Sequence, residues 1–206
     1  MPLRAAVPGA GVRGAAPVVR DLRGRAAGPL SLSFAEGDLV VVSGLPGGGK
    51  STLIERTAPA GAGIDSQVVR ERWERRMPGW LPYAVYRPAV RVAHYWGLWR
   101  AVASGASLVV HDCGTQAWVR AALARAARRR GRALHLLLLD ASPREALAGQ
   151  AARGRGVSAY AFARHRATAS RLIRSAESGH LPPGCTTATL LDRPAANRLK
   201  TITFHT

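Results

Sequence analysis

The sequence predicts a three-layer α/β domain whose central, mostly parallel sheet has about five strands. Strand-like and helix-like segments alternate along most of the 206 residues, as they do when helices cover both faces of a parallel sheet. The run from Leu39 to Val42 is apolar and mostly β-branched, which is typical of a strand buried on both faces. Hydrophobic residues make up 47% of the chain, enough for a substantial core.

The individual elements follow from local patterns. Val18 to Leu22 and Leu30 to Phe34 predict two short strands across a glycine-rich turn. After the buried strand at 39–42, a glycine-rich loop leads into a short helix near residues 51–57. Further strands are expected at 108–111, 134–139 and 186–191, and further helices near 116–130, 144–152 and 158–178.

Residues 1 to about 15 are expected to form a flexible leader outside the fold, because they are rich in Ala, Gly, Pro and Arg and contain no acidic residue. Proline and glycine interrupt every apolar stretch in this segment, so it does not have the pattern of an export signal. The domain is then expected over residues 16–206, with a helical aromatic-rich insert at 71–104 and a lid with a long helix at 150–178.

Charge and cysteine content limit the classes of partner and compartment. Thirty Lys and Arg residues stand against twelve Asp and Glu, for a formal net charge of +18. Such a field attracts phosphate-bearing partners, so nucleic acid is one candidate partner. The two cysteines offer neither a disulfide framework nor a zinc-ligand spacing, which favours a cytoplasmic setting. No apolar run approaches the roughly 20 residues of a membrane span, so no membrane partner is expected.

The most informative segment is the glycine-rich loop that follows the strand at 39–42. It matches the phosphate-binding pattern G-x-x-x-x-G-K-[ST], the Walker A motif. Its glycines let successive backbone N–H groups point at phosphate oxygens, and the following helix N-terminus adds positive potential. Lys50 is expected on the β- and γ-phosphates of ATP, and the Ser51 hydroxyl on Mg²⁺. The residues expected to bind the nucleotide are Gly44, Leu45, Pro46, Gly47, Gly48, Gly49, Lys50, Ser51 and Thr52.

A second acidic group is expected near the metal, because Mg²⁺ prefers carboxylate and water oxygens. Two apolar strands end in an aspartate, at Asp112 and Asp140. With Asp140 in this role the chain would resemble a transporter ATPase, but such ATPases carry a glutamate next to that aspartate and an upstream Ser-Gly-Gly signature. Ala141 follows Asp140 and the signature is absent. Asp112 is therefore favoured as the metal-side acid, and Asp140 is expected to cap the helix that begins near Ser142.

A carboxylate on the acceptor side is expected at Asp65. A short strand ending there would bring it beside the glycine-rich loop, where it could accept the proton of an acceptor hydroxyl. The alternative is an N-cap for a helix that begins at Ser66. Arg70 is a candidate ligand for an anionic acceptor. His111, next to the metal-side acid, is expected to have a structural role.

These features together resemble the small P-loop kinase group, which includes polynucleotide 5′-kinases, zeta toxins, chloramphenicol phosphotransferase, gluconate kinases and related AAA-domain proteins of actinobacteria. The resemblance covers roughly residues 36 to 200 and rests on the Walker motif, the Asp-Ser-x-x-x-Arg stretch from Asp65, the strand ending in Asp112 with Thr115, and the later basic helix. It implies a kinase-like P-loop NTPase fold and ATP-dependent phosphorylation of a hydroxyl. It also implies that Asp65 is the acceptor-side base and Arg120 a ligand of acceptor or phosphate. The stretch from Asp112 to Thr115 departs from the Asp-Ala-Thr-like sequence of relatives, which leaves the role of Thr115 open.

Two further regions are expected around the reaction. Arg153 and Arg155 are expected in a mobile lid that neutralises charge on the migrating phosphoryl group. The insert, broken by three prolines, holds most of the aromatic residues, between Trp73 and Trp99. They would either stack a ring of the acceptor or, as favoured for most of them, pack onto the sheet. The arginine-rich helix at 116–130, which contains Arg120, Arg125 and Arg128 to Arg130, is expected to expose a solvated face, with nucleic-acid binding as the alternative.

The favoured function is therefore an ATP- and Mg²⁺-dependent kinase acting on a hydroxyl of a small molecule or a nucleic-acid end. The alternatives are a P-loop ATPase, either transporter-like or nucleic-acid-dependent, and a nucleotide-binding regulator without turnover. The sequence does not identify the acceptor.

Overall fold

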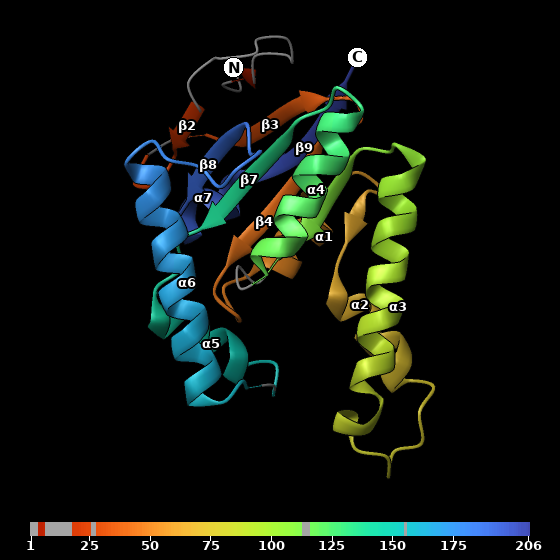
Figure 1. Ribbon diagram of the computed structural model, residues 1–206. Coiled ribbons are helices and arrows are strands. Elements are labelled where there is room, and N and C mark those ends of the chain that lie inside the picture. Colours follow the sequence, from red (N-terminus) through yellow and green to blue (C-terminus); the bar gives the residue numbers. More distant parts are fainter. Residues whose placement is uncertain (1–3, 7–17, 26–27, 113–115, 155) are drawn as a thin grey trace.

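A six-stranded sheet forms the centre of the computed structural model (Figure 1). Its strands are β2 (Val18–Asp21), β4 (Leu39–Gly44), β5 (Gly63–Ile64), β6 (Leu108–His111), β7 (Leu134–Leu139) and β8 (Thr187–Leu191). Their order across the sheet is β2-β8-β7-β4-β6-β5, and the pairings between neighbours are parallel. The structure describes residues 4–6, 18–25, 28–112, 116–154 and 156–206.

Helices pack on both faces of this sheet, which confirms the predicted three-layer α/β fold (Figure 1). The helices are α1 (Lys50–Thr57), α2 (Ser66–Glu74), α3 (Tyr83–Ser104), α4 (Ala117–Arg129), α5 (Pro143–Ala151), α6 (Ala159–Glu177) and α7 (Arg193–Arg198). Residues of α3, α4 and α6 pack on one face, and residues of α1 and α7 pack on the other. No helix of the described segments is both long and apolar enough to cross a membrane.

Strand β4 shows why its apolar run needs two packed layers. Val40, Val41 and Val42 are all 0% exposed. Val41 belongs to the core cluster under α3 and α4, whereas Val40 and Val42 belong to the cluster under α1 and α7. Successive side chains of a strand point to opposite faces, so a continuously apolar strand must be covered on both. The predicted burial of this strand is confirmed.

A second, three-stranded sheet joins segments from near both ends of the chain. Strand β3 (Leu30–Ala35) pairs in parallel with β9 (Leu199–His205) and not with β2, which pairs with β8 in the central sheet. Both strands predicted on either side of the glycine-rich turn are therefore present, but they belong to different sheets. Leu32 and Phe34 of β3 pack against Ile202 in the same apolar cluster, and this contact between distant segments decides the pairing. Strand β1 (Arg4–Ala6), within the predicted leader, also pairs in parallel with β3.

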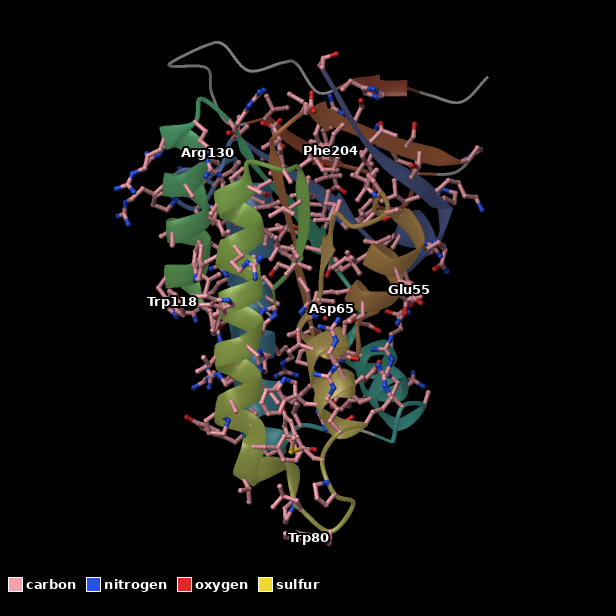
Figure 2. All side chains as sticks on the ribbon, turned by 90° about the vertical axis from the view of Figure 1, so that its right-hand side faces the viewer. Glu55, Asp65, Trp80, Trp118, Arg130 and Phe204 are labelled. Atoms are coloured by element: carbon pink, nitrogen blue, oxygen red, sulfur yellow. The ribbon has the colours of Figure 1, made fainter. Side chains whose placement is uncertain are left out.

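The insert is mainly the pair α2 and α3. Pro88 lies inside α3, so the expectation that all three prolines divide the segment is wrong at this position. Tyr95 and Trp99 pack against the core, as favoured for the aromatic residues. Trp80 and Trp96, in contrast, are 79% and 69% exposed. Figure 2 shows Trp80 at the tip of the insert, at the opposite end of the molecule from Phe204.

A buried polar cluster closes the end of the sheet at which β4 begins. The Asp38 carboxylate accepts hydrogen bonds from the backbone N–H groups of Ala35 and Ala133, and it lies 3.0 Å from His135 Nε2. His135 Nδ1 lies 2.8 Å from the Thr187 hydroxyl. Burial on its own would raise the pKa of Asp38, but these hydrogen bonds hold it below its usual value. The cluster thus ties β4, β7 and β8 together.

Candidate active site

The glycine-rich loop joins the end of β4 to the start of α1. Gly47 and Gly49 have φ angles of 83° and 95°, a left-handed conformation that glycine adopts without steric cost. A Cβ on Gly47 would lie 2.1 Å from the Ala146 carbonyl oxygen, and one on Gly149 would lie 2.3 Å from the Gly47 carbonyl oxygen. Helix α5 therefore packs backbone to backbone against the loop. The loop pattern was recognised from the sequence, whereas nothing in the sequence singled out Gly149.

Lys50 lies folded over this loop. Its ammonium donates hydrogen bonds of 2.8 Å to the carbonyl oxygens of Gly44 and Leu45, and the residue is only 3% exposed. A buried ammonium requires such partners, because desolvation of an unpaired charge is costly. The charge is thereby held beside a cavity of about 150 Å³, the cavity at the loop, which Ser51 also lines.

Two side chains connect α5 to the loop and to α1. Gln150 donates from Nε2 to the Pro46 carbonyl oxygen over 3.0 Å and accepts from the backbone N–H of Val157 over 3.0 Å. Arg153 donates to the Thr52 hydroxyl over 3.0 Å. The structure thus brings the predicted lid residue Arg153 to the loop, whereas Arg155 lies outside the described residues. Sequence reasoning missed Gln150, because a single glutamine in a helix carries no pattern of its own.

A cavity of about 720 Å³ brings three of the predicted site residues together. Ser51, Asp65 and Arg153 all line it, from α1, the end of β5 and the end of α5. Figure 2 shows Asp65 near the middle of the molecule, with Glu55 of α1, which also lines the cavity, farther toward the edge of the view. Residues predicted separately from three motifs therefore share one space.

Asp65 both caps a helix and lines the cavity, so its position is compatible with each of the two roles considered for it. Its Oδ1 accepts a 2.9 Å hydrogen bond from the backbone N–H of Gln67, so it is the N-cap of α2. The residue is 8% exposed and lines the cavity beside Ser51. Its Oδ2 has no hydrogen-bond partner among the described residues. Oδ1 therefore caps α2, and Oδ2 is available to accept a hydrogen bond or a proton from a ligand.

His111 is a neighbour of this carboxylate. Its Nδ1 lies 3.9 Å from Asp65 Oδ1, and its side chain is 15% exposed. Burial and the nearby charge of Lys50 lower the pKa of His111 to about 4, although Asp65 opposes this shift. The imidazole is therefore neutral near pH 7. The sequence predicted a structural role, but His111 also lines the cavity at the loop.

Asp112 and Arg120 form a buried ion pair at the end of β6. Arg120 Nη1 donates to Asp112 Oδ2 over 2.7 Å, and the residues are 6% and 8% exposed. Arg120 does not belong to a solvated helix face as expected, because it lies between the buried residues Val119 and Leu123 on the core-facing side of α4. Arg125, Arg128, Arg129 and Arg130 are exposed, as predicted. Cys113, Gly114 and Thr115 lie outside the described residues.

Asp140 has a different environment. Its carboxylate pairs with Arg23 over 2.6 Å, and its side chain is 40% exposed. It does not cap α5 as predicted. Ser142 is the N-cap and forms a capping box with Glu145. Pro143 follows at the first helical position, where a backbone N–H is not needed.

Comparison with known proteins shows the family to which this chain belongs. A family model described as AAA domain (AAA_33) matches residues 39–174, a span that runs from β4 through the glycine-rich loop, Asp65, Asp112 and Arg153 into α6. The chain belongs to this AAA domain family. A search of curated proteins finds no match. One similar solved structure is the crystal structure of a "putative kinase" from Chloroflexus aurantiacus, with 18% identity, coverage of 75% of this chain and 84% of that one, and a TM-score of 0.47.

The matched AAA domain contains a second cavity, of about 380 Å³. It lies between α2, α3, α4 and α6, with the end of β6 as its floor. The predicted acceptor ligands Arg70 and Arg120 both line it. The Arg70 guanidinium lies 4.0 Å from the centre of the Tyr83 ring and donates to Glu74 over 2.6 Å. Arg70 also lines the cavity at the loop, so the two spaces adjoin.

Proposed function

We propose that this protein is an ATP- and Mg²⁺-dependent kinase that transfers the γ-phosphoryl group of ATP to a hydroxyl of an acceptor. The observation that carries the proposal is the shared cavity of Ser51, Asp65 and Arg153 beside the Walker A loop. A phosphoryl-transfer site needs a phosphate cradle, a carboxylate near the acceptor hydroxyl and a cation over the migrating group. These three residues and the loop supply one of each.

Nucleotide binding is assigned to the loop and to a cavity of about 220 Å³ next to it. The loop amides and Lys50 would hold the β- and γ-phosphates, with the ammonium exchanging its carbonyl partners for phosphate oxygens. The adjoining cavity is lined by α1, the end of α5 and α7, with Arg153 and Arg193 on its walls. The planar guanidinium of Arg193 can stack on a ring, so we assign the nucleotide base to this cavity and reserve Arg153 for the γ-phosphoryl group.

The donor groups for Mg²⁺ are oxygen atoms, as this cation requires. Ser51 would hold it directly, and Asp112, whose Oδ2 pairs with Arg120, would hold it through water, together with phosphate oxygens of ATP. The described residues contain no cluster of three or more His, Cys, Asp or Glu side chains that could bind a metal without a nucleotide. This fits a cation that arrives with the triphosphate. When bound, it would neutralise charge on the β- and γ-phosphates.

The chemical step follows from the position of Asp65. The acceptor oxygen forms a bond to the γ-phosphorus while the bond to the β,γ-bridging oxygen breaks and ADP leaves with the electron pair. The acceptor proton passes to Asp65 Oδ2, the oxygen that does not cap α2. Arg153 offsets negative charge on the migrating group.

Labelled ATP tests this proposal. The full chain is incubated with γ-³²P-ATP, Mg²⁺ and fractions of a small-molecule extract, and labelled products are separated from free phosphate. A labelled acceptor formed by the wild type and not by Lys50→Ala supports the kinase. Release of free phosphate with no labelled acceptor in any fraction would instead establish the ATPase alternative.

A further inference from the structure

We propose that the acceptor is a small molecule that carries a phosphate group, and that Arg87 and Arg91 bind this group in the second cavity. The inference rests on the proposed kinase function, because it concerns the acceptor of that reaction. The bound phosphate remains unchanged: only the hydroxyl at the other end of the acceptor enters the transfer step.

The cavity-facing side of α3 carries the first argument. Tyr83, Arg87, Val90, Arg91, His94, Tyr95 and Leu98 line the cavity. Their spacing of three and four residues defines one helical stripe, which is normally apolar when a helix packs on a domain. Near Leu98 this stripe is buried and apolar, but farther from the sheet it carries two arginines at the i and i+4 positions. Arg87 and Arg91 are both exposed, and two like charges so spaced destabilise a helix slightly, a cost that a bound anion would offset.

The balance of charge in the cavity carries the second argument. Its described lining contains five arginines, namely Arg70, Arg87, Arg91, Arg120 and Arg164, and a single carboxylate, Asp112. Asp112 is held by Arg120, and Arg70 is paired with Glu74 just outside the lining. Arg87, Arg91 and Arg164 have no carboxylate partner among the described residues. Guanidinium groups gathered without counter-charges are suited to the oxygens of a phosphate group.

The position of the cavity carries the third argument. Gln67, Arg70 and His111 line both this cavity and the cavity at the loop, where Lys50 and Ser51 lie. A molecule in the second cavity can thus present a hydroxyl beside His111 and Asp65 while its phosphate contacts Arg87 and Arg91. A volume of about 380 Å³ is at the lower end of the range for small-molecule pockets. We therefore infer a small phosphomonoester and not a polynucleotide.

Calorimetry on the full chain tests the inference. The loop is first saturated with the β,γ-imido analogue of ATP and Mg²⁺, so that added phosphate esters cannot bind there. Glycerol 3-phosphate, ribose 5-phosphate and thymidine 5′-monophosphate are then titrated, each beside its unphosphorylated counterpart, and a 5′-phosphorylated oligonucleotide is titrated separately. At least one small ester should bind more than tenfold tighter than its counterpart, because charge-assisted hydrogen bonds are strong.

The variant Arg87→Gln/Arg91→Gln should lose at least about tenfold in affinity for that ester. The matched control Arg100→Gln/Arg125→Gln removes two exposed charges from α3 and α4 outside the cavity, and its affinity should stay within about twofold of the wild type. Thermal unfolding should show that both variants remain folded. Binding of no small ester, equal binding by the first variant and wild type, or binding of the oligonucleotide alone would overturn the inference.

The kinase proposal can fail independently of this inference. Arginine-dependent ester binding without any transfer from γ-³²P-ATP would leave the anion site standing and remove the kinase. Transfer to an unphosphorylated acceptor, equally fast in Arg87→Gln/Arg91→Gln, would keep the kinase and overturn the anion site.

Discussion

Two buried histidine–aspartate pairs lie at opposite ends of the central sheet, and their surroundings differ. Asp38 and His135, where β4 begins, are 3.0 Å apart, and hydrogen bonds from two backbone N–H groups and contact with the Thr187 hydroxyl complete the cluster. Asp65 and His111, at the carboxyl ends of β5 and β6, are 3.9 Å apart and line cavities. The hydrogen-bonding groups of Asp38 and His135 are thus bonded within the protein. The Asp65 carboxylate, in contrast, keeps one oxygen without a partner among the described residues and lines a cavity that could hold a ligand.

This difference suggests that the first pair stabilises the fold and that the second pair takes part in the reaction. A carboxylate whose hydrogen-bonding capacity is used within the protein stabilises the fold. A buried carboxylate with an unpartnered oxygen facing a cavity costs stability, and such groups gather at functional sites. The comparison therefore predicts that substitutions at the two ends affect different measurements.

The largest effect is expected for Asp65→Asn. It keeps an oxygen for the N-cap of α2 but removes the proton acceptor, so transfer should fall by about 10²- to 10⁴-fold while ATP binding is retained. Phosphoryl transfer measured beside ATP affinity checks this. Undiminished transfer would remove Asp65 from the role of base.

Asp38→Ala should have the opposite profile. It leaves His135 and the Ala133 N–H without their buried partner, so the free energy of unfolding should fall by about 3 kcal/mol. Urea denaturation measures the loss, and kcat of the folded fraction should stay near the wild-type value. If Asp38→Ala reduced kcat as strongly as Asp65→Asn, the functional distinction between the two ends would be lost.

Gly149→Ala tests how α5 supports the loop. The new Cβ would meet the Gly47 carbonyl oxygen at 2.3 Å, so the loop must shift and ATP affinity should fall by roughly tenfold, which corresponds to about 1.4 kcal/mol. Gly97→Ala in α3 is the matched control, since its Cβ would meet nothing within 4 Å. Its ATP affinity should equal that of the wild type. Equal ATP affinity in Gly149→Ala and Gly97→Ala would show that the contact with α5 does not shape the loop.

The last comparison concerns the pH dependence of stability. The pKa of His111 is about 4 in the folded state, below its usual value near 6.5. The unfolded chain therefore binds more protons between these values, and the free energy of unfolding falls as the pH drops from about 6.5 to 4, by at most about 1.4 kcal/mol per pH unit for this group.

Chemical denaturation at a series of pH values separates the two ends. His111→Gln should flatten the slope between about pH 6.5 and 4. Asp38→Ala should flatten it only below about pH 4, because the pKa of Asp38 is lowered and its contribution is lost there. Unchanged slopes in both variants would contradict the assigned protonation states.

The sequence predicted those parts of the molecule that local patterns encode. The apolar run of β4, the glycine-rich loop and the acidic end of β6 depend on neighbouring residues, and the structure places them as expected for a P-loop domain. For the same reason Asp65 could be proposed either as a site carboxylate or as a helix cap, and the structure confirms the cap.

Contacts between distant segments were not predictable in this way. Strands β3 and β9 pair across most of the chain length, and no local pattern in either segment identifies this partner. The burial of Arg120 depends on Asp112 of the preceding strand. The roles of Gly149 and Gln150 depend on the approach of α5 to the loop, which no spacing within either segment encodes.

The contact between Gly47 and Gly149 couples α5 to the loop. Because the two backbones touch and Gln150 bridges Pro46 to Val157, a shift of α5 would displace the loop amides to which the proposed function assigns the phosphates. A nucleotide that orders the loop would in turn hold α5 in place.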